Sequence, residues 1–143
     1  MNHSSFRISK IRLQRGATLI EVLVALLVLS IGLLGVAALQ VSALQTNQSA
    51  HVRSQASVLA YDIADRMRAN RDVAMAGGYN VTYAVTPTGT NLNQLDLQNW
   101  KAALANTLPT GQGELVTVGN IAVIRVRWTD KQGTQVFETR TQI

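Results

Sequence analysis

The sequence predicts an α+β protein in which one long N-terminal helix packs on a small antiparallel sheet. Two observations predict this class: an apolar run at residues 17–39 continues into an amphipathic helical pattern, and three strand-like segments follow near the C-terminus. We therefore expect four parts in the 143 residues: a basic segment at 1–16, an apolar helix at 17–39, its amphipathic continuation at 40–76, and an α+β region at 77–143.

The apolar run reads ATLIEVLVALLVLSIGLLGVAAL, and Glu21 is its only charged residue. At about 1.5 Å per residue a helix of this length measures roughly 34 Å, which is enough to span a bilayer. A removable secretory signal has an apolar core of only about 7 to 15 residues, with its cleavage site behind it. Here the expected cutting point, Gly16, precedes the run, so the apolar helix remains in the mature protein as its N-terminus.

The positive charge of the chain is concentrated before the apolar run. Of 13 Lys and Arg residues, Arg7, Lys10, Arg12 and Arg15 lie there without any acidic residue, and residues 17–143 have a net charge of +1. The positive-inside rule places this leader in the cytoplasm and the rest of the chain outside. A nucleic-acid-binding role loses its main support, because the basicity belongs to the leader.

The string RGATLIEVLVALLVLSIGLLG resembles the prepilin signature of type IV pilins and type II secretion pseudopilins. Matched residue by residue, Gly16 ends the leader, Ala17 becomes the new N-terminus, and Glu21 is the acidic residue at the fifth mature position. The resemblance implies that a prepilin peptidase cuts after Gly16 and that the same enzyme methylates the amine of Ala17. Major pilins most often begin with Phe, whereas this chain would begin with Ala17.

Glu21 needs a compensating charge if it lies at membrane depth. A carboxylate there costs about 2.5 to 3.5 kcal/mol even on the mild insertion scale. The free amine of Ala17 is the nearest candidate, four residues away on the same helical face. The resemblance implies that Glu21 pairs with the N-terminus of an adjacent subunit and sets the axial register. Alternatively, Glu21 reaches the membrane interface and stays hydrated.

Three small residues, Ser30, Gly32 and Gly35, interrupt the apolar helix. Small residues at such spacings favour lateral packing of helices or a local bend. The alternative is that they are simply tolerated in lipid, where Gly is commoner than in soluble helices.

The amphipathic pattern predicts one continuous helix from about Thr18 to near Ala74. Its apolar stripe consists of Val41, Leu44, Val52, Leu59, Ile63 and Met67, with Ala56, Ala60 and Ala64 beside them. On the polar side, four-residue spacings predict ion pairs of Asp62 with Arg66 and of Arg68 with Asp72. These are either ordinary surface pairs or contacts between subunits.

The C-terminal region is expected to hold a short helix and three strands. The helix begins at Asp96 as its N-cap and ends before Pro109. In the second strand, alternate residues from Ala122 to Trp128 fall on one face and Arg125 and Arg127 on the other, which is typical of a half-exposed antiparallel sheet.

Three arginines, Arg125, Arg127 and Arg140, are expected on the outer sheet face. They either form a solvated face paired with Glu138 or Asp130, or dock another pilin or DNA.

Within the family, the segment YDIADRMRANRD and the C-terminal half resemble the minor pilins called type IV pilus modification proteins. The resemblance implies a minor subunit needed for pilus assembly. Its expected partners are prepilin peptidase, other minor and major pilins, the inner-membrane assembly platform, and membrane lipid before assembly. It is expected first in the inner membrane with a periplasmic C-terminal domain, then in the extracellular pilus.

Two other functions stay open, a minor pseudopilin of a type II secretion system and a DNA-binding or adhesive pilin. An enzyme is not expected. The chain has no Cys, and its two histidines, His3 and His51, show no metal-ligand spacing. We accordingly expect no cofactor and no metal.

Overall fold

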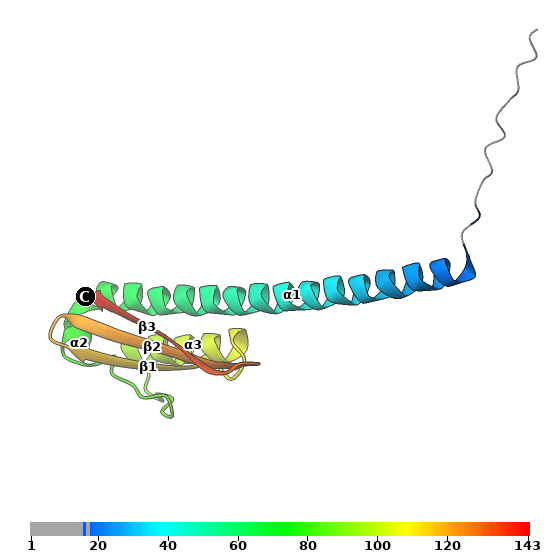
Figure 1. Ribbon diagram of the computed structural model, residues 1–143. Helices are drawn as coiled ribbons and strands as arrows, with labels where there is room; N and C mark the ends of the chain where they lie inside the picture. Colours follow the sequence, from blue (N-terminus) through cyan, green and yellow to red (C-terminus); the bar gives the residue numbers. More distant parts are fainter. Residues whose placement is uncertain (1–15, 17) are drawn as a thin grey trace, which may run out of the picture. The chain divides into compact units, whose positions relative to one another are not determined.

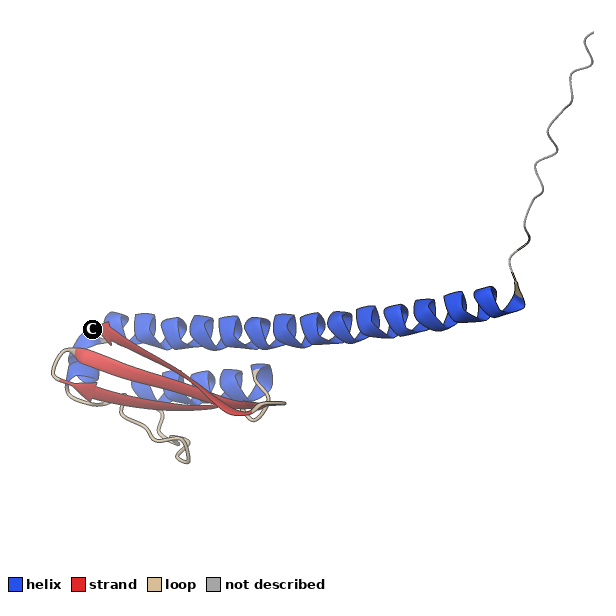
Figure 2. Ribbon diagram, viewed as in Figure 1, coloured by secondary structure: helices blue, strands red, loops and turns tan. Residues whose placement is uncertain are grey.

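The computed structural model describes Gly16 and residues 18–143. Its elements are α1 (Leu19–Ala69), α2 (Arg71–Met75), α3 (Leu92–Thr107), β1 (Gln112–Val118), β2 (Ile121–Asp130) and β3 (Gly133–Gln142) (Figures 1 and 2). The predicted α+β class, with a long N-terminal helix and a small antiparallel sheet, is confirmed. The chain divides into two compact units between Ala43 and Leu44, and α1 contributes to both.

The sheet of the second unit has the strand order β1-β2-β3, with both neighbouring pairs antiparallel (Figure 1). Two-residue turns join the strands, because Val118 pairs with Ile121 and Asp130 with Gly133. Gly119 in the first turn has φ +61°, the left-handed conformation that such tight hairpin turns require.

One face of this sheet carries the core. As the alternation predicts, Ala122, Ile124, Val126 and Trp128 are buried. They share one core cluster with apolar residues of α1 (Ala56, Ala60, Ile63, Ala64, Met67) and of α3 (Leu97, Trp100, Leu104). The indole N–H of Trp100 donates to the carbonyl oxygen of Leu59 at 2.9 Å, which ties α3 directly to α1.

The apolar stripe of α1 is covered only from Val52 onward. Val52 and Leu59 are partly buried against the core, whereas Val41 is 53% exposed and Leu44 is 69% exposed. The periodicity predicted which side of the helix is apolar, but the sheet reaches only the later turns of that side.

The predicted continuous helix to Ala74 is interrupted at Asn70, whose φ of −120° and ψ of 53° are not helical. The pairing of Arg68 with Asp72 is therefore wrong, because Asp72 lies beyond the break in α2. Arg68 instead contacts Asp65 at 2.6 Å and donates to the carbonyl oxygen of Gln142 at 3.2 Å. The predicted pair of Asp62 and Arg66 is confirmed at 3.0 Å.

The predicted start of the short helix at Asp96 is also wrong. α3 begins at Leu92 with Asn91 as its N-cap, so Asp96 lies inside the helix and is buried. The helix ends at Thr107, ahead of Pro109, as expected.

Gly111 is required by close packing at the end of α3. A Cβ there would overlap the backbone carbonyl of Leu104 and the Cβ of Leu108. We expect Gly111→Ala to destabilise the protein by about 1 to 3 kcal/mol, as overpacking generally does. Thermal unfolding of the full chain in detergent, followed by circular dichroism, measures this loss. The control is Gly35→Ala, whose Cβ would meet nothing within 4 Å. Equal stability of both variants would contradict the prediction.

Candidate functional site

In its described part, the first unit consists almost entirely of α1 from Leu19 to Ala43. An 18-residue window of α1 has a mean hydropathy of 2.9, and none of it is buried within the protein. By length and composition the helix can cross a membrane. The large side chains from Leu19 to Leu39 are all more than 45% exposed. A surface this apolar requires lipid or the apolar surface of a partner around it.

Glu21 lies in the first turn of this helix, where a negative charge is favoured by the helix dipole. Its backbone N–H donates to the carbonyl oxygen of Thr18 at 3.0 Å, with the Thr18 hydroxyl at 3.4 Å. The T-x-x-E spacing of Thr18 and Glu21 is a helix-start signature, and it is the signal in the sequence for where this helix begins. The carboxylate of Glu21 forms no ion pair with any described residue. Its expected partner, Ala17, lies outside the described residues.

The small residues of the apolar helix leave room on its surface. A Cβ at Gly32 or Gly35 would meet nothing within 4 Å. The hydroxyl of Ser30 donates to the carbonyl oxygen of Leu26 at 2.7 Å, so it is satisfied within its own helix. Neighbouring helices can therefore approach closely here without burying an unpaired polar group, and lateral packing stays a prediction.

A buried polar network connects the end of α1 to α3. The hydroxyl of Tyr79 donates to Asp96 Oδ2 at 2.8 Å, and Arg66 donates to Asp96 Oδ1 at 3.2 Å. Asn70, at the helix break, donates to the Tyr79 hydroxyl at 3.3 Å. Burial raises the pKa of Tyr79 above its ordinary value, so its hydroxyl stays a donor to Asp96.

Two known families match the chain in adjoining segments. Residues 11–37 match the prokaryotic N-terminal methylation motif, and residues 38–99 match the family described as Type IV pilin Tt1218. The chain is a type IV pilin-like protein. No curated protein and no solved structure matches it.

The two matches cover different features of this pilin-like protein. The methylation motif includes Gly16 and Glu21, and the second match includes the network of Arg66, Tyr79 and Asp96. All three strands lie beyond both matches. Neither match names the type IV pilus modification proteins, so that finer resemblance is not confirmed.

On the outer sheet face of the pilin-like protein, two of the three arginines pair with carboxylates of neighbouring strands or of their own strand. Arg125 contacts Glu114 at 2.8 Å and Glu138 at 2.7 Å, and Arg140 contacts Glu138 at 3.0 Å. The two guanidinium groups, that of Arg125 foremost, hold the pKa of Glu138 below its ordinary value. Pairing with Glu138 is confirmed.

The third arginine of that face, Arg127, stacks over the ring of Tyr83 at 4.0 Å and donates to Gln112 at 2.7 Å. The predicted alternative partner Asp130 instead accepts from the backbone of Gln132 at 2.8 Å. The three arginines thus lie in a network of local contacts, which favours a solvated face over a DNA-docking surface.

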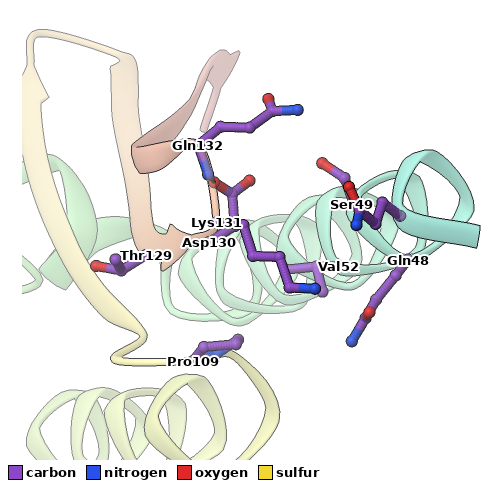
Figure 3. Close-up of a pocket in the computed structure, with 9 residues that line it drawn as sticks. Gln48, Ser49, Val52, Pro109, Thr129, Asp130, Lys131 and Gln132 are labelled. Atoms are coloured by element: carbon purple, nitrogen blue, oxygen red, sulfur yellow. Dashed lines mark hydrogen bonds between the residues drawn. The ribbon is translucent and has the colours of Figure 1, made fainter. Parts of the chain in front are cut away.

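A shallow groove of about 370 Å³ lies between α1 and the β2–β3 turn of the pilin-like protein (Figure 3). Figure 3 shows Gln48, Ser49 and Val52 on the helix facing Pro109 and the turn residues 129–132. The lining has one carboxylate and one ammonium group, without a histidine or a cysteine. Among the described residues no cluster of His, Cys, Asp or Glu could hold a metal ion. Type IV pilins are structural and not catalytic proteins.

Proposed function

We propose that this pilin-like protein is a minor pilin, a low-copy subunit that initiates, primes or caps a type IV pilus. The observation that carries the proposal is the first unit itself. An apolar helix with none of its membrane-length part buried begins at Leu19, close behind Gly16, and Glu21 is the sole charge in residues 17–39. The adjoining matches to the methylation motif and to a type IV pilin support the same assignment.

The proposed mechanism begins in the inner membrane. The apolar helix spans the bilayer with the basic leader in the cytoplasm and residues 40–143 in the periplasm. Prepilin peptidase removes residues 1–16, which releases an amine at Ala17 and makes it available for methylation. This amine is four residues from Glu21, so cleavage supplies a positive charge where the helix carries its only negative one.

Assembly then exchanges one apolar surrounding for another. The assembly platform moves the helix from lipid into the filament core, where apolar faces of neighbouring pilins replace the lipid tails. Because both surroundings are apolar, packing and the pairing of charges distinguish them, rather than the hydrophobic effect. We propose that Gly32 and Gly35 allow close helix contacts and that Glu21 pairs with the N-terminus of a neighbour.

A minor pseudopilin of a type II secretion system is the second candidate. It would share the leader, the helix and the cleavage step, and the match to the methylation motif favours it equally. Deletion of the gene distinguishes the two, because loss of surface pili and loss of protein secretion are separate phenotypes.

Cleavage is tested by the intact mass of the protein from membranes with and without prepilin peptidase. We expect loss of residues 1–16 only when the peptidase is present, with at most one methyl group on the new N-terminus. Gly16→Val serves as the control, since a bulky residue at the cleavage position should leave the chain uncut even with the peptidase. A chain that stays full length in every strain would refute the proposed function.

A further inference from the structure

The two edges of the sheet differ in what covers their backbone groups. At the outer edge of β1, Leu115 donates to the carbonyl oxygen of Val81 at 2.8 Å, and Val81 donates back at 2.9 Å. The backbone N–H of Thr117 donates to the side-chain oxygen of Asn80 at 2.7 Å. Residues 80–81 therefore close the β1 edge at Leu115 and Thr117.

The loop that follows this closure is itself fixed in place. Lys101 on α3 donates to the carbonyl oxygens of Thr82 at 2.6 Å and Tyr83 at 3.3 Å, and also to that of Val85. The ring of Tyr83 lies against the guanidinium of Arg127 on the outer sheet face. These contacts hold the loop around the β1 edge from both sides.

The outer edge of β3 is open along most of its length. Ile143 donates to the carbonyl oxygen of Asn120 at 2.9 Å, so the odd-numbered residues of β3 bond to β2 and the even-numbered ones direct their backbone groups outward. Of these, the carbonyl of Gln142 accepts a hydrogen bond from Arg68. Within the described chain, the outward backbone groups of residues 134–140 form no hydrogen bond. They make a row about 20 Å long at strand spacing.

Natural edge strands that avoid pairing are very short, or carry charged side chains, Pro, a bulge or a cover. Of these devices β3 has only two charged residues and the contact of Arg68 at Gln142. Its sequence, GTQVFETRTQ, lacks Pro and Lys, and its pairing with β2 runs without a bulge from Gly133 to Gln142. Its two charged residues, Glu138 and Arg140, are paired with each other. A row of free backbone donors and acceptors without Pro, a bulge or a covering segment is complementary to an extended polypeptide.

We propose that the open edge of β3 binds an edge strand of a different pilin-like subunit, which adds to the sheet as a fourth strand. This inference rests on the proposed function, because it requires a filament of several subunits. It identifies both the contact surface on this chain and the kind of partner that it takes.

A second copy of the chain does not fit this edge. Pairing β3 with β3 places the same patch on both sides, and such a contact needs a two-fold axis. Successive subunits of a one-directional filament are related by a screw rotation, so β3 of one copy would have to meet β1 of the next. That β1 edge is closed at Leu115 and Thr117 by residues 80–81. The partner must therefore be another subunit with an open strand.

The test exploits the alternation of backbone directions along β3. Val136→Pro removes an outward N–H and leaves the hydrogen bonds to β2 intact, whereas the control Val136→Thr retains that N–H. In cells that assemble the filament, we expect the Pro variant to be cut after Gly16 and to keep its melting temperature within a few degrees. We expect its amount in sheared filaments to fall about tenfold, against less than about twofold for the Thr variant.

A second measurement does not depend on the Pro variant folding. A photo-crosslinking amino acid replaces Val136 in the otherwise native chain, with the same replacement at Val116 in β1 as the control. We expect an adduct from position 136, and not from 116, to one extended segment of a different pilin-like subunit. Normal filament incorporation of Val136→Pro, adducts between two copies, or equal adducts from both positions would overturn the inference. A chain cut after Gly16 with any of these results leaves the proposed function intact, whereas an uncut chain removes both.

Discussion

Replacing Glu21 with Leu is expected to leave membrane insertion and cleavage after Gly16 unchanged and to remove the protein from filaments. In the proposed filament core, the amine of the neighbouring Ala17 would lose its partner and remain charged among apolar side chains. A charge in such a position costs about 2.5 to 3.5 kcal/mol on the insertion scale, so we expect at least about a tenfold loss. The measurement is the ratio of protein in sheared filaments to protein in membranes.

Two further substitutions make this result specific. Val22→Leu, one residue away on the same exposed helix, should assemble normally, because it changes only apolar volume. Glu21→Asp keeps the charge on a shorter side chain and should assemble partially. Normal assembly of Glu21→Leu would instead favour the alternative in which Glu21 is merely hydrated at the membrane interface.

Replacing Asp96 with Ala is expected to destabilise the second unit by about 3 kcal/mol. The substitution leaves the buried hydroxyl of Tyr79 without its acceptor and deprives Arg66 of the less exposed of its two carboxylates. Truncating one member of a buried hydrogen-bonded pair exposes the desolvation penalty of the other. Thermal unfolding of the full chain in detergent reports the change.

Asp62→Ala is the matched control for Asp96→Ala. It removes the other carboxylate that contacts Arg66, at 3.0 Å, but the Asp62 side chain is 45% exposed. Solvent-exposed pairs on a helix contribute only about 0.3 to 0.5 kcal/mol. Losses of similar size in both variants would mean that the network of Asp96 and Tyr79 does not hold α1 and α3 together.

The regular part of the fold could be predicted because the spacing of apolar residues along a helix or strand indicates which face is buried. Alternation from Ala122 to Trp128 identified the buried face of β2, and the helical stripe identified the inward residues of α1 from Val52 to Met67. What the period could not reveal is how far the cover extends. Val41 belongs to the same stripe as Ile63, yet it is exposed.

The polar residues were harder to predict, because their roles depend on residues that are distant in sequence. Asp is a residue type favoured at helix N-caps, but Asp96 lies inside α3, where its carboxylate accepts hydrogen bonds from Tyr79 and Arg66. The sequence signal for a buried Asp96 was its place next to Leu97, on the helix face that also carries Trp100. The sequence signal for the helix break at Asn70 was weaker, since a single Asn is tolerated in most helices.

Of the candidate site, the apolar helix and its single charge followed from sequence, because they are contiguous. The difference between the two sheet edges did not. This difference depends on the contacts of Asn80 and Val81 with β1, which lies more than thirty residues later in the chain. No sequence pattern around these two residues predicts the contacts.

The links between α1 and the rest of the second unit have a mechanical consequence. Trp100 bonds to α1 at Leu59, Asp96 at Arg66, and the end of β3 at Arg68, so the attachments are spread over about the last three turns of one helix. A pull along the helix axis would shear these attachments together, instead of peeling them apart one after another. In the proposed filament, a subunit fastened in this way would distribute tensile load over several bonds at once.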